Sequence, residues 1–174
     1  MRASNLRAFA ALTSDGNITA WGWSSYGANG APTDAGYVAV YSTGYAFAAV
    51  KGTGSITVWG DSSNGGSGAP TDVGYVAVYS TGRAFAAVKA DGSITAWGYT
   101  SRGGSGAPTD AGYVTVYSTF KAFAAVKADG SITAWGNSDY GDYGASGAPT
   151  DAGYFTVYST SGCLLYTSPS PRDS

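Results

Sequence analysis

Side chains that could carry out bond-making chemistry are scarce in this 174-residue chain. It contains no histidine and one cysteine, and all eleven of its acidic residues are aspartates. Without histidine, neither a Ser-His-Asp nor a Cys-His catalytic arrangement can form, and histidine metal sites are excluded as well. A single cysteine supplies neither an internal disulfide nor a thiolate zinc site. The composition therefore predicts a protein that is not an enzyme and that uses no cofactor.

The aspartates recur too regularly to indicate a metal site. Four of them follow a proline at equivalent positions: Asp34, Asp72, Asp110 and Asp151. Calcium needs several oxygen ligands that converge on one point, whereas each segment here offers one carboxylate. Turn formation after proline explains them better, so we expect no bound metal. We expect Lys89 with Asp91, and Lys127 with Asp129, to form exposed pairs across their turns.

Aromatic and arginine side chains offer the chemistry of recognition rather than of catalysis. They occur in the segment after each Trp-Gly pair, where residues differ from one segment to the next. Tyr, Trp and Arg are enriched at protein interfaces, and loops on a rigid frame commonly carry recognition. The candidate partner-binding residues are Trp23, Tyr26, Tyr99, Arg102, Tyr140 and Tyr143. The residue before each Ala-Phe dipeptide varies too: Arg7, Tyr45, Arg83 and Lys121. Neutral drift of exposed loops is the alternative explanation.

The frame that must position these residues is a tandem repeat. The Ala-Phe dipeptide begins at residues 8, 46, 84 and 122, a constant step of 38, and the Trp-Gly pairs keep that step. The last Ala-Pro-Thr-Asp segment is displaced by a three-residue insertion within 137–147. A fixed period of this length is typical of solenoids, propellers and related arrays. We divide the chain into a truncated repeat remnant, 1–7, and four repeats over 8–161.

Each repeat is expected to consist of three β-strands. Asp-Gly joins the short apolar runs 84–90 and 93–98, which is a strong hairpin signal. A third strand, 113–119, precedes the next hairpin and is rich in Val, Thr and Tyr. Residues 38–41 are apolar or aromatic on both faces, as strands are when sheets stack on either side. The predicted fold is all-β, with 38-residue three-stranded units arranged like propeller blades.

The repeats could form an open arc or a closed ring of four blades. Closure would require the last strand, 154–160, to pair beside the first hairpin at Ala8. We favour the arc, whose unprotected end strands would promote self-association. A β-solenoid with three strands per turn is the alternative architecture.

The repeat resembles a known family. The pattern "Val-x-x-Tyr-Ser-Thr-Gly-x-Ala-Phe-Ala-Ala-Val-Lys-x-Asp-Gly-Ser-Ile-Thr-Ala-Trp-Gly" is similar to the regulator-of-chromosome-condensation type of β-propeller repeat over about residues 8–160. It departs from that family in two ways. Phe9, Phe47, Phe85 and Phe123 replace the usual histidine, and the Gly-Gln-Leu-Gly after Trp-Gly is missing. The resemblance implies propeller-like blades, and functions in the family range from nucleotide exchange on small GTPases to ubiquitin-ligase scaffolding.

The segment 162–174 breaks the repeat, and we expect an artefactual or disordered tail there. Residues 163–173 resemble a conceptual translation of a transposon-based sequencing adapter. Cys163 belongs to this segment, so cysteine usage says nothing about the compartment. We expect the natural protein to be longer and to contain more repeats.

The sequence predicts a non-catalytic scaffold that binds an unknown protein partner through the loops after each Trp-Gly. A net charge of −2 argues against a nucleic-acid partner. No apolar run reaches the length that a membrane helix needs, and we expect no membrane contact. The alternative function is a secreted or surface repeat protein, of adhesin or ice-binding type, with Thr19, Thr57, Thr95 and Thr133 in a row.

Overall fold

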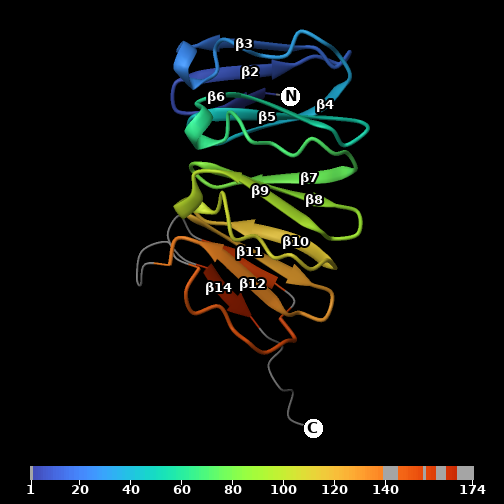
Figure 1. The fold of residues 1–174 in the computed structure, drawn as a ribbon, viewed down its shortest axis with the longest axis vertical. Helices are drawn as coiled ribbons and strands as arrows, with labels where there is room; N and C mark the ends of the chain where they lie inside the picture. The colour runs from blue at the N-terminus through green and yellow to red at the C-terminus, as the bar shows by residue number, and fades with distance from the viewer. Residues whose placement is uncertain (1, 139–144, 155, 160–163, 168–174) are drawn as a thin grey trace.

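Antiparallel sheets stacked along the long axis of the molecule form the fold (Figure 1). The structure is a computed structural model that describes residues 2–138, 145–154, 156–159 and 164–167. Regular secondary structure in these residues consists of β-strands and three short 3₁₀ turns. The predicted all-β class is confirmed.

Four of the sheets have three strands each, and the Ala-Phe strand is always in the middle. Their strands in chain order are β1 (Arg2–Ser4), β2 (Ala8–Leu12) and β3 (Ile18–Gly22); β4 (Tyr37–Ser42), β5 (Ala46–Lys51) and β6 (Ile56–Gly60); β7 (Tyr75–Ser80), β8 (Ala84–Lys89) and β9 (Ile94–Gly98); β10 (Tyr113–Ser118), β11 (Ala122–Lys127) and β12 (Ile132–Gly136). A complete sheet therefore begins at the tyrosine-rich strand, ahead of the Ala-Phe dipeptide that marks the repeats in the sequence.

The last sheet has two strands in the described residues, β13 (Thr156–Ser159) and β14 (Leu164–Thr167), which pair in antiparallel fashion. Strand β14 lies within 162–174, so these four residues differ from the tail that we expected there. Leu, Tyr and Thr suit a strand, and the edge of β13 offers backbone groups to pair with.

The sheets do not close into a four-bladed ring. Closure would require the last strand of the repeats to pair beside β2. That edge of β2 is paired with β1, and β13 is paired with β14. The described part of the chain is thus an open stack, as favoured from the sequence. Every strand pair in it is antiparallel, which also excludes the β-solenoid alternative.

The core lies between successive sheets rather than within one of them. Ala46 and Ala48 of β5 belong to the same buried cluster as Phe85 of β8 and Trp97 of β9. Apart from Ala11 in β2, the alanines of the middle strands are fully buried, and their small side chains let neighbouring sheets approach closely. Stacking of apolar faces therefore supplies most of the burial that stabilises the array.

Each buried tryptophan ties its sheet to the loop of the preceding one. Short 3₁₀ turns follow the Trp-Gly pairs: η1 (Ser24–Tyr26), η2 (Ser62–Asn64) and η3 (Thr100–Arg102). The Trp59 Nε1 donates to the Gly27 carbonyl just after η1 at 2.9 Å, and Trp97 repeats this with Gly65 at 3.2 Å. Trp59 and Trp97 therefore pack between successive sheets. Trp21, in the first sheet, is 47% exposed.

None of the helical turns in the described residues has the length and apolar character that crossing a membrane requires.

Candidate functional site

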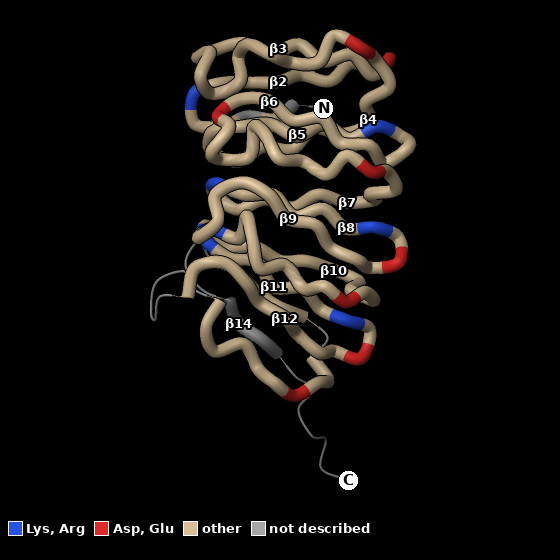
Figure 2. Tube along the Cα trace, in the orientation of Figure 1, with Lys and Arg blue, Asp and Glu red and all other residues tan. Residues whose placement is uncertain are grey.

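Charged residues separate onto two edges of the stack. The hairpin-turn edge carries alternating acidic and basic residues, while the edge with the 3₁₀ turns is mainly basic (Figure 2). Strand direction explains the separation, because each β-hairpin places its turn at one edge and its open ends at the other. The two edges offer different chemistry and are described in turn.

The hairpin-turn edge repeats one ion pair in three sheets. Lys51 pairs with Asp34, Lys89 with Asp72 and Lys127 with Asp110. The expected pairs of Lys89 with Asp91 and Lys127 with Asp129 are wrong. Asp91 and Asp129 instead accept hydrogen bonds from the backbone N–H and hydroxyl of the serine two residues later. Strand pairing sets Lys89 opposite Tyr75, whose hydroxyl bonds to Asp72, so the more distant aspartate lies beside the lysine while the nearer one caps its own turn.

A tyrosine and a threonine complete each of these clusters. The Tyr37 hydroxyl lies 2.9 Å from an Asp34 oxygen and 2.9 Å from the Thr57 hydroxyl. The lysine hydrogen bond, and then that of the tyrosine, lower the pKa of Asp34, while the same pairing raises the pKa of Lys51. Burial raises the pKa of the Tyr37 hydroxyl. These are structural clusters, since every polar group named is already engaged.

The threonine row is not an exposed ladder. Thr57, Thr95 and Thr133 are partly buried and lie within hydrogen-bond distance of a tyrosine hydroxyl. Thr19 alone among the four is exposed. An ice-binding or adhesive threonine surface therefore lacks the regular free hydroxyls that it would need.

The described residues contain no group of three or more acidic, cysteine or histidine side chains that could hold a metal ion.

The opposite edge brings arginine and aromatic side chains together. The Arg7 guanidinium lies 4.5 Å from the Trp23 ring centroid and 5.4 Å from that of Tyr26. Tyr26 in turn stacks on Tyr45 of the next sheet, with ring centroids 5.3 Å apart. Cations within about 6 Å of an aromatic face gain favourable cation–π energy. These contacts hold side chains from two sheets in one arrangement.

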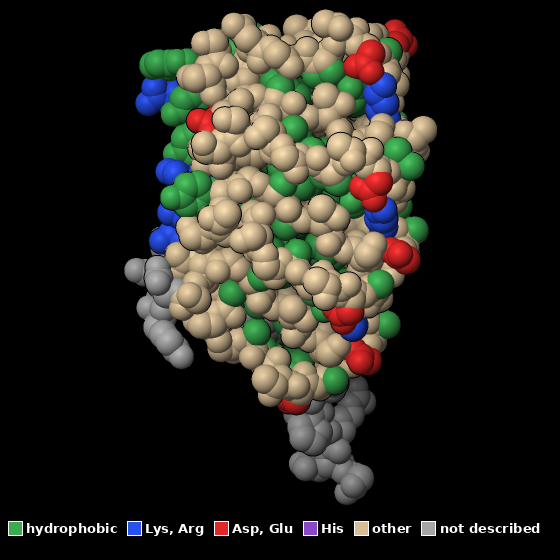
Figure 3. Space-filling view, viewed as in Figure 1, with side chains coloured by type: hydrophobic (Ala, Val, Ile, Leu, Met, Phe, Trp, Pro, Cys, Tyr) green, Lys and Arg blue, Asp and Glu red, His purple; other side chains and the backbone are tan. Residues whose placement is uncertain are grey.

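The same arrangement continues into the third sheet. The Arg83 guanidinium lies 4.8 Å from the Tyr45 ring centroid and 5.6 Å from that of Tyr99, and its Nη2 donates to the Tyr45 hydroxyl at 3.2 Å. A continuous chain of contacts thus crosses three sheets, and Figure 3 shows apolar and basic side chains following this edge. We call it the aromatic–arginine row: Arg7, Trp23, Tyr26, Tyr45, Arg83 and Tyr99.

Three of the six predicted partner-binding residues belong to this row: Trp23, Tyr26 and Tyr99. Arg102 lies apart, with its guanidinium 5.7 Å from the Phe120 ring centroid. Tyr140 and Tyr143 fall outside the described residues. Arg7, Tyr45 and Arg83 were not in the predicted set, although variation at their position between repeats was a signal for them.

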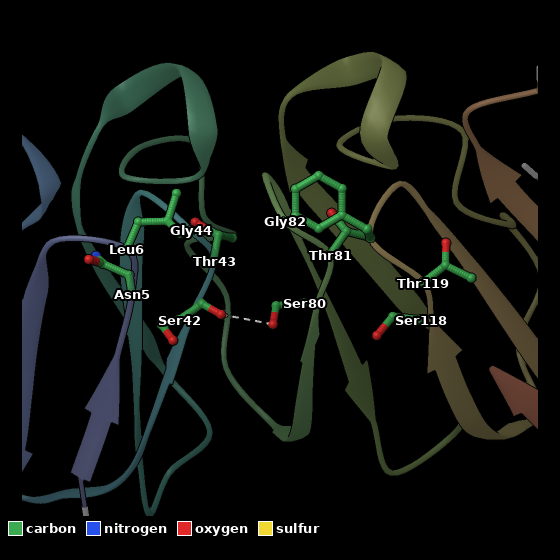
Figure 4. Close-up of a pocket in the computed structure, with 11 residues that line it drawn as sticks. Asn5, Leu6, Ser42, Thr43, Gly44, Ser80, Thr81, Gly82, Ser118 and Thr119 are labelled. Carbon is green, nitrogen blue, oxygen red and sulfur yellow. Dashed lines mark hydrogen bonds between the residues drawn. The ribbon is translucent and has the colours of Figure 1, made fainter. Parts of the chain in front are cut away.

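A pocket of about 440 Å³ lies beside the row, and no sequence pattern predicted it. Its lining repeats from sheet to sheet, because Ser42 and Thr43 recur as Ser80 and Thr81 (Figure 4). One position within it varies, and we call these four residues the glycine trough: Leu6, Gly44, Gly82 and Phe120. Leu6 is 67% and Phe120 48% exposed, so apolar surface reaches solvent at both ends of the trough.

The trough is built on backbone hydrogen bonds between sheets. Leu6 N–H donates to the Gly44 carbonyl at 3.2 Å, Gly44 N–H to Gly82 at 2.9 Å and Gly82 N–H to Phe120 at 3.0 Å. A Cβ on Gly82 would come within 2.4 Å of the Phe120 ring, so the ring can lie there only because residue 82 is a glycine. The varied position is therefore part of the packing along the stack.

Neither a family model nor a curated protein matches the chain. Among solved structures, it is similar to the ectodomain of the receptor kinase CR4 from Physcomitrella patens, with a TM-score of 0.68 and 18% identity over 90% of this chain and 46% of that one. The CRINKLY WD40 ectodomain of the Arabidopsis thaliana receptor kinase ACR4 gives a TM-score of 0.61 and 16% identity over 90% and 54%. Yeast RCC1 (Prp20) gives 0.59 and 16% over 78% and 42%.

The chain spans about half the length of these solved chains. At such low identity the likeness concerns the fold alone. The chain has the fold of an RCC1-like β-propeller repeat array, as the repeat pattern predicted.

Proposed function

We propose that the chain is a non-catalytic repeat scaffold that binds a protein partner along the aromatic–arginine row. One observation carries the proposal. Residues that differ between the repeats meet on one edge in a continuous row, whereas the residues of the opposite edge repeat almost unchanged. Repeated residues are explained by packing and capping in each unit. The varied aromatic and arginine side chains have the composition of an interface centre.

The stable frame supports recognition by this edge. Trp23 is 55% and Tyr99 41% exposed, although each is large and apolar. Such rings offer a large contact area at a low cost in conformational entropy, since cation–π contacts with Arg7 and Arg83 already restrain them. A partner would therefore meet a surface that is partly ordered before binding.

Chemistry on this edge is limited to recognition in our proposal. The row contains no acid, base or nucleophile in a reactive arrangement, and the chain has no histidine. A nucleic-acid partner is not part of the proposal, because the row contains two arginines and the chain has a net charge of −2.

Structural neighbours support a role in protein binding. Yeast RCC1 (Prp20) has been crystallised bound to Kap60, and the structure of Prp20p has been described with its binding to Gsp1p and histones. Two other neighbours are ectodomains of receptor kinases. Open repeat arrays of this kind serve as platforms, and we extend that general role to this chain.

Self-association through the end sheets is a second mode of protein binding in the proposal. Phe9 and Trp21 of the first sheet are 50% and 47% exposed, whereas their counterparts Phe47 and Trp59 are buried. Sedimentation of the purified chain would detect it as a mass that rises with concentration. A constant monomer mass would contradict this mode without affecting the row.

The test of the main proposal is a comparison of two variants in quantitative affinity purification. The row variant carries Trp23→Ala, Arg83→Ala and Tyr99→Ala. The control variant carries Asp34→Asn, Asp72→Asn and Asp110→Asn on the opposite edge. We expect proteins enriched by the wild-type chain to be lost with the row variant and kept with the control. Equal recovery with the row variant would contradict the proposal, as would the absence of any enriched protein.

A further inference from the structure

The glycine trough and the aromatic–arginine row form one surface. Leu6, Gly44 and Gly82 in the trough are followed directly by Arg7, Tyr45 and Arg83 in the row. In the first three sheets, the turn between the first and the middle strand thus contributes one residue to the trough and one to the row. A partner that reaches the row is therefore also in reach of the trough.

The trough is suited to an apolar group because its polar walls are already satisfied. The Thr43 hydroxyl donates to the Asn64 carbonyl at 3.0 Å and accepts from the Ala46 N–H at 3.0 Å. The Ser80 hydroxyl donates to the Ser42 carbonyl at 2.9 Å (Figure 4). An inserted polar group would find these partners occupied and would lose its own water. Leu6 and Phe120, both exposed, would instead gain apolar contact.

The apolar ends of the trough depend on its two glycines. Gly44 and Gly82 lie between Leu6 and Phe120, and neither has a left-handed φ that would require glycine. Their lack of a Cβ makes room for those two apolar side chains, since a Cβ on Gly44 would lie 3.3 Å from Leu6 and one on Gly82 would lie 2.4 Å from the Phe120 ring. The trough is a broad depression of about 440 Å³ that opens to solvent, so a large side chain can enter it from the surface.

The charges around the trough favour an acidic partner. Arg7 and Arg83 lie in the row, and Arg102 lies against Phe120 at its end. Among the described residues, Asp61 is the aspartate on this edge, and one of its carboxylate oxygens accepts hydrogen bonds from the backbone N–H groups of Ser63 and Asn64 in capping η2. Other described aspartates lie at the hairpin turns or just before β4, β7, β10 and β13.

We propose that the partner of this edge is an acidic protein segment that inserts one large apolar side chain into the glycine trough. This inference rests on the proposed function and adds the chemistry of the partner to it. Carboxylates flanking the apolar side chain bind the guanidiniums of Arg7 and Arg83. Ring contacts hold both guanidiniums in place, and Arg83 is also partly buried, which strengthens charge-assisted hydrogen bonds to it.

An array of synthetic seven-residue peptides tests this directly on the intact chain. The central residue is Leu, Phe or Gly, and the flanking residues are all Glu, all Ser or all Lys. We expect the Glu-flanked peptides with Leu or Phe to bind most tightly, and their affinity to fall as salt is raised. Equal binding of the Gly-centred peptides would overturn the trough, and equal binding of Ser- or Lys-flanked peptides would overturn the acidic partner. Binding of no peptide would overturn both.

Matched variants connect peptide binding to the trough and the row. Gly44→Ala places a methyl group in the trough, 3.2 Å from the Gly82 carbonyl oxygen and 3.3 Å from Leu6. Gly52→Ala is the control, since its Cβ on the other edge meets Val38 at an ordinary 3.9 Å. We expect Gly44→Ala to weaken binding of the Glu-flanked peptides about tenfold and Gly52→Ala to leave it unchanged. Leu6→Ala removes one end of the trough without crowding it and should also weaken binding.

Charge and shape at Arg83 are separated by two further variants. Arg83→Gln should weaken the Glu-flanked peptides about tenfold and reduce the effect of salt, while Arg83→Lys should keep part of both. A single-stranded oligonucleotide that bound more tightly than any peptide, in an Arg83-dependent manner, would overturn the inference in favour of nucleic acid. Row-dependent capture of a protein without the peptide preference would overturn only the inference. Capture that does not depend on the row would overturn the proposed function itself.

Discussion

The lysine–aspartate pairs are the residues through which pH should act on the fold. Pairing lowers the pKa of Asp34, Asp72 and Asp110, so their stabilisation is present above the usual aspartate value of 3.8. It is lost as the pH falls through the lowered folded-state pKa values. The paired lysines have raised pKa values, so their stabilisation is present below the usual 10.5 and lost above it. No histidine titrates between these limits.

We therefore expect the free energy of unfolding to stay nearly constant from about pH 5 to pH 8 and to fall below about pH 4. The variant Asp34→Asn, Asp72→Asn, Asp110→Asn should show a shallower fall, because it has no paired carboxylates left to protonate at these sites. Urea unfolding at a series of pH values measures both. An identical acid transition in the variant would show that these clusters do not set the pH dependence.

A second prediction concerns the tryptophans that reach the preceding loop. Trp97→Phe keeps a ring but removes the hydrogen bond to the Gly65 carbonyl, and it leaves that acceptor buried. We expect a loss of about 1–3 kcal/mol in the free energy of unfolding. Trp21→Phe is the matched control, since the Trp21 side chain is 47% exposed, and should change stability little. Similar losses in chemical denaturation would contradict the role of the inter-sheet bond.

At the scale of elements, the hairpin turns bind one sheet to the next. Gly92 has a φ of +80°, and a Cβ there would come 2.3 Å from the Tyr113 backbone nitrogen of the following sheet. Gly112 has a similar φ of +90° but open space around it. The pair separates the cost of a left-handed backbone from the cost of a clash.

We expect Gly112→Ala to cost about 1–2 kcal/mol, which is the penalty of a left-handed conformation for an L-residue. Gly92→Ala should cost more, since the turn must also move away from Tyr113. Thermal unfolding of the two variants gives the comparison. Equal costs would mean that the contact between the turn and the next sheet contributes nothing.

The strands themselves could be read from the sequence because their signals are local. Asp-Gly turns, β-branched runs and the 38-residue step each lie within a few residues or repeat visibly. Ion-pair partners could not be read in this way. Lys89 pairs with Asp72, 17 residues away, rather than with Asp91. The pairing of β7 with β8 sets Lys89 opposite Tyr75, and this register places Asp72 beside the lysine.

The candidate site was only partly predictable for a similar reason. Variation after Trp-Gly pointed to Trp23, Tyr26 and Tyr99, but the arginines that bind them come from a different strand end. Gly44 and Gly82 carried no signal of a pocket, because a glycine in a repeat with many glycines looks like part of a turn. Their role depends on what the next sheet places above them, which sequence patterns do not reveal.

For the whole molecule, stability should reflect contacts between neighbouring sheets. Phe85 is fully buried and belongs to a core shared by the second and third sheets. We expect Phe85→Ala to cost about 3–5 kcal/mol. Phe9→Ala should cost much less, because Phe9 is 50% exposed in the first sheet.

Because sheets contact only their neighbours, Phe85→Ala should also divide the array into parts that unfold separately. Hydrogen exchange would then show earlier opening of β5 and β8 than of β11. A single cooperative transition, equally shifted at every amide, would contradict this view of the molecule.

The direction of the indole hydrogen bonds has a consequence for synthesis on the ribosome. Trp59, Trp97 and Trp135 each bond to a carbonyl 32 residues earlier in the chain. As the polypeptide emerges, the acceptor loop is always made before the indole that needs it. The sheets can therefore fold one after another from the N-terminus during synthesis. Each new sheet packs on the sheet before it, whose acceptor loop has already been made.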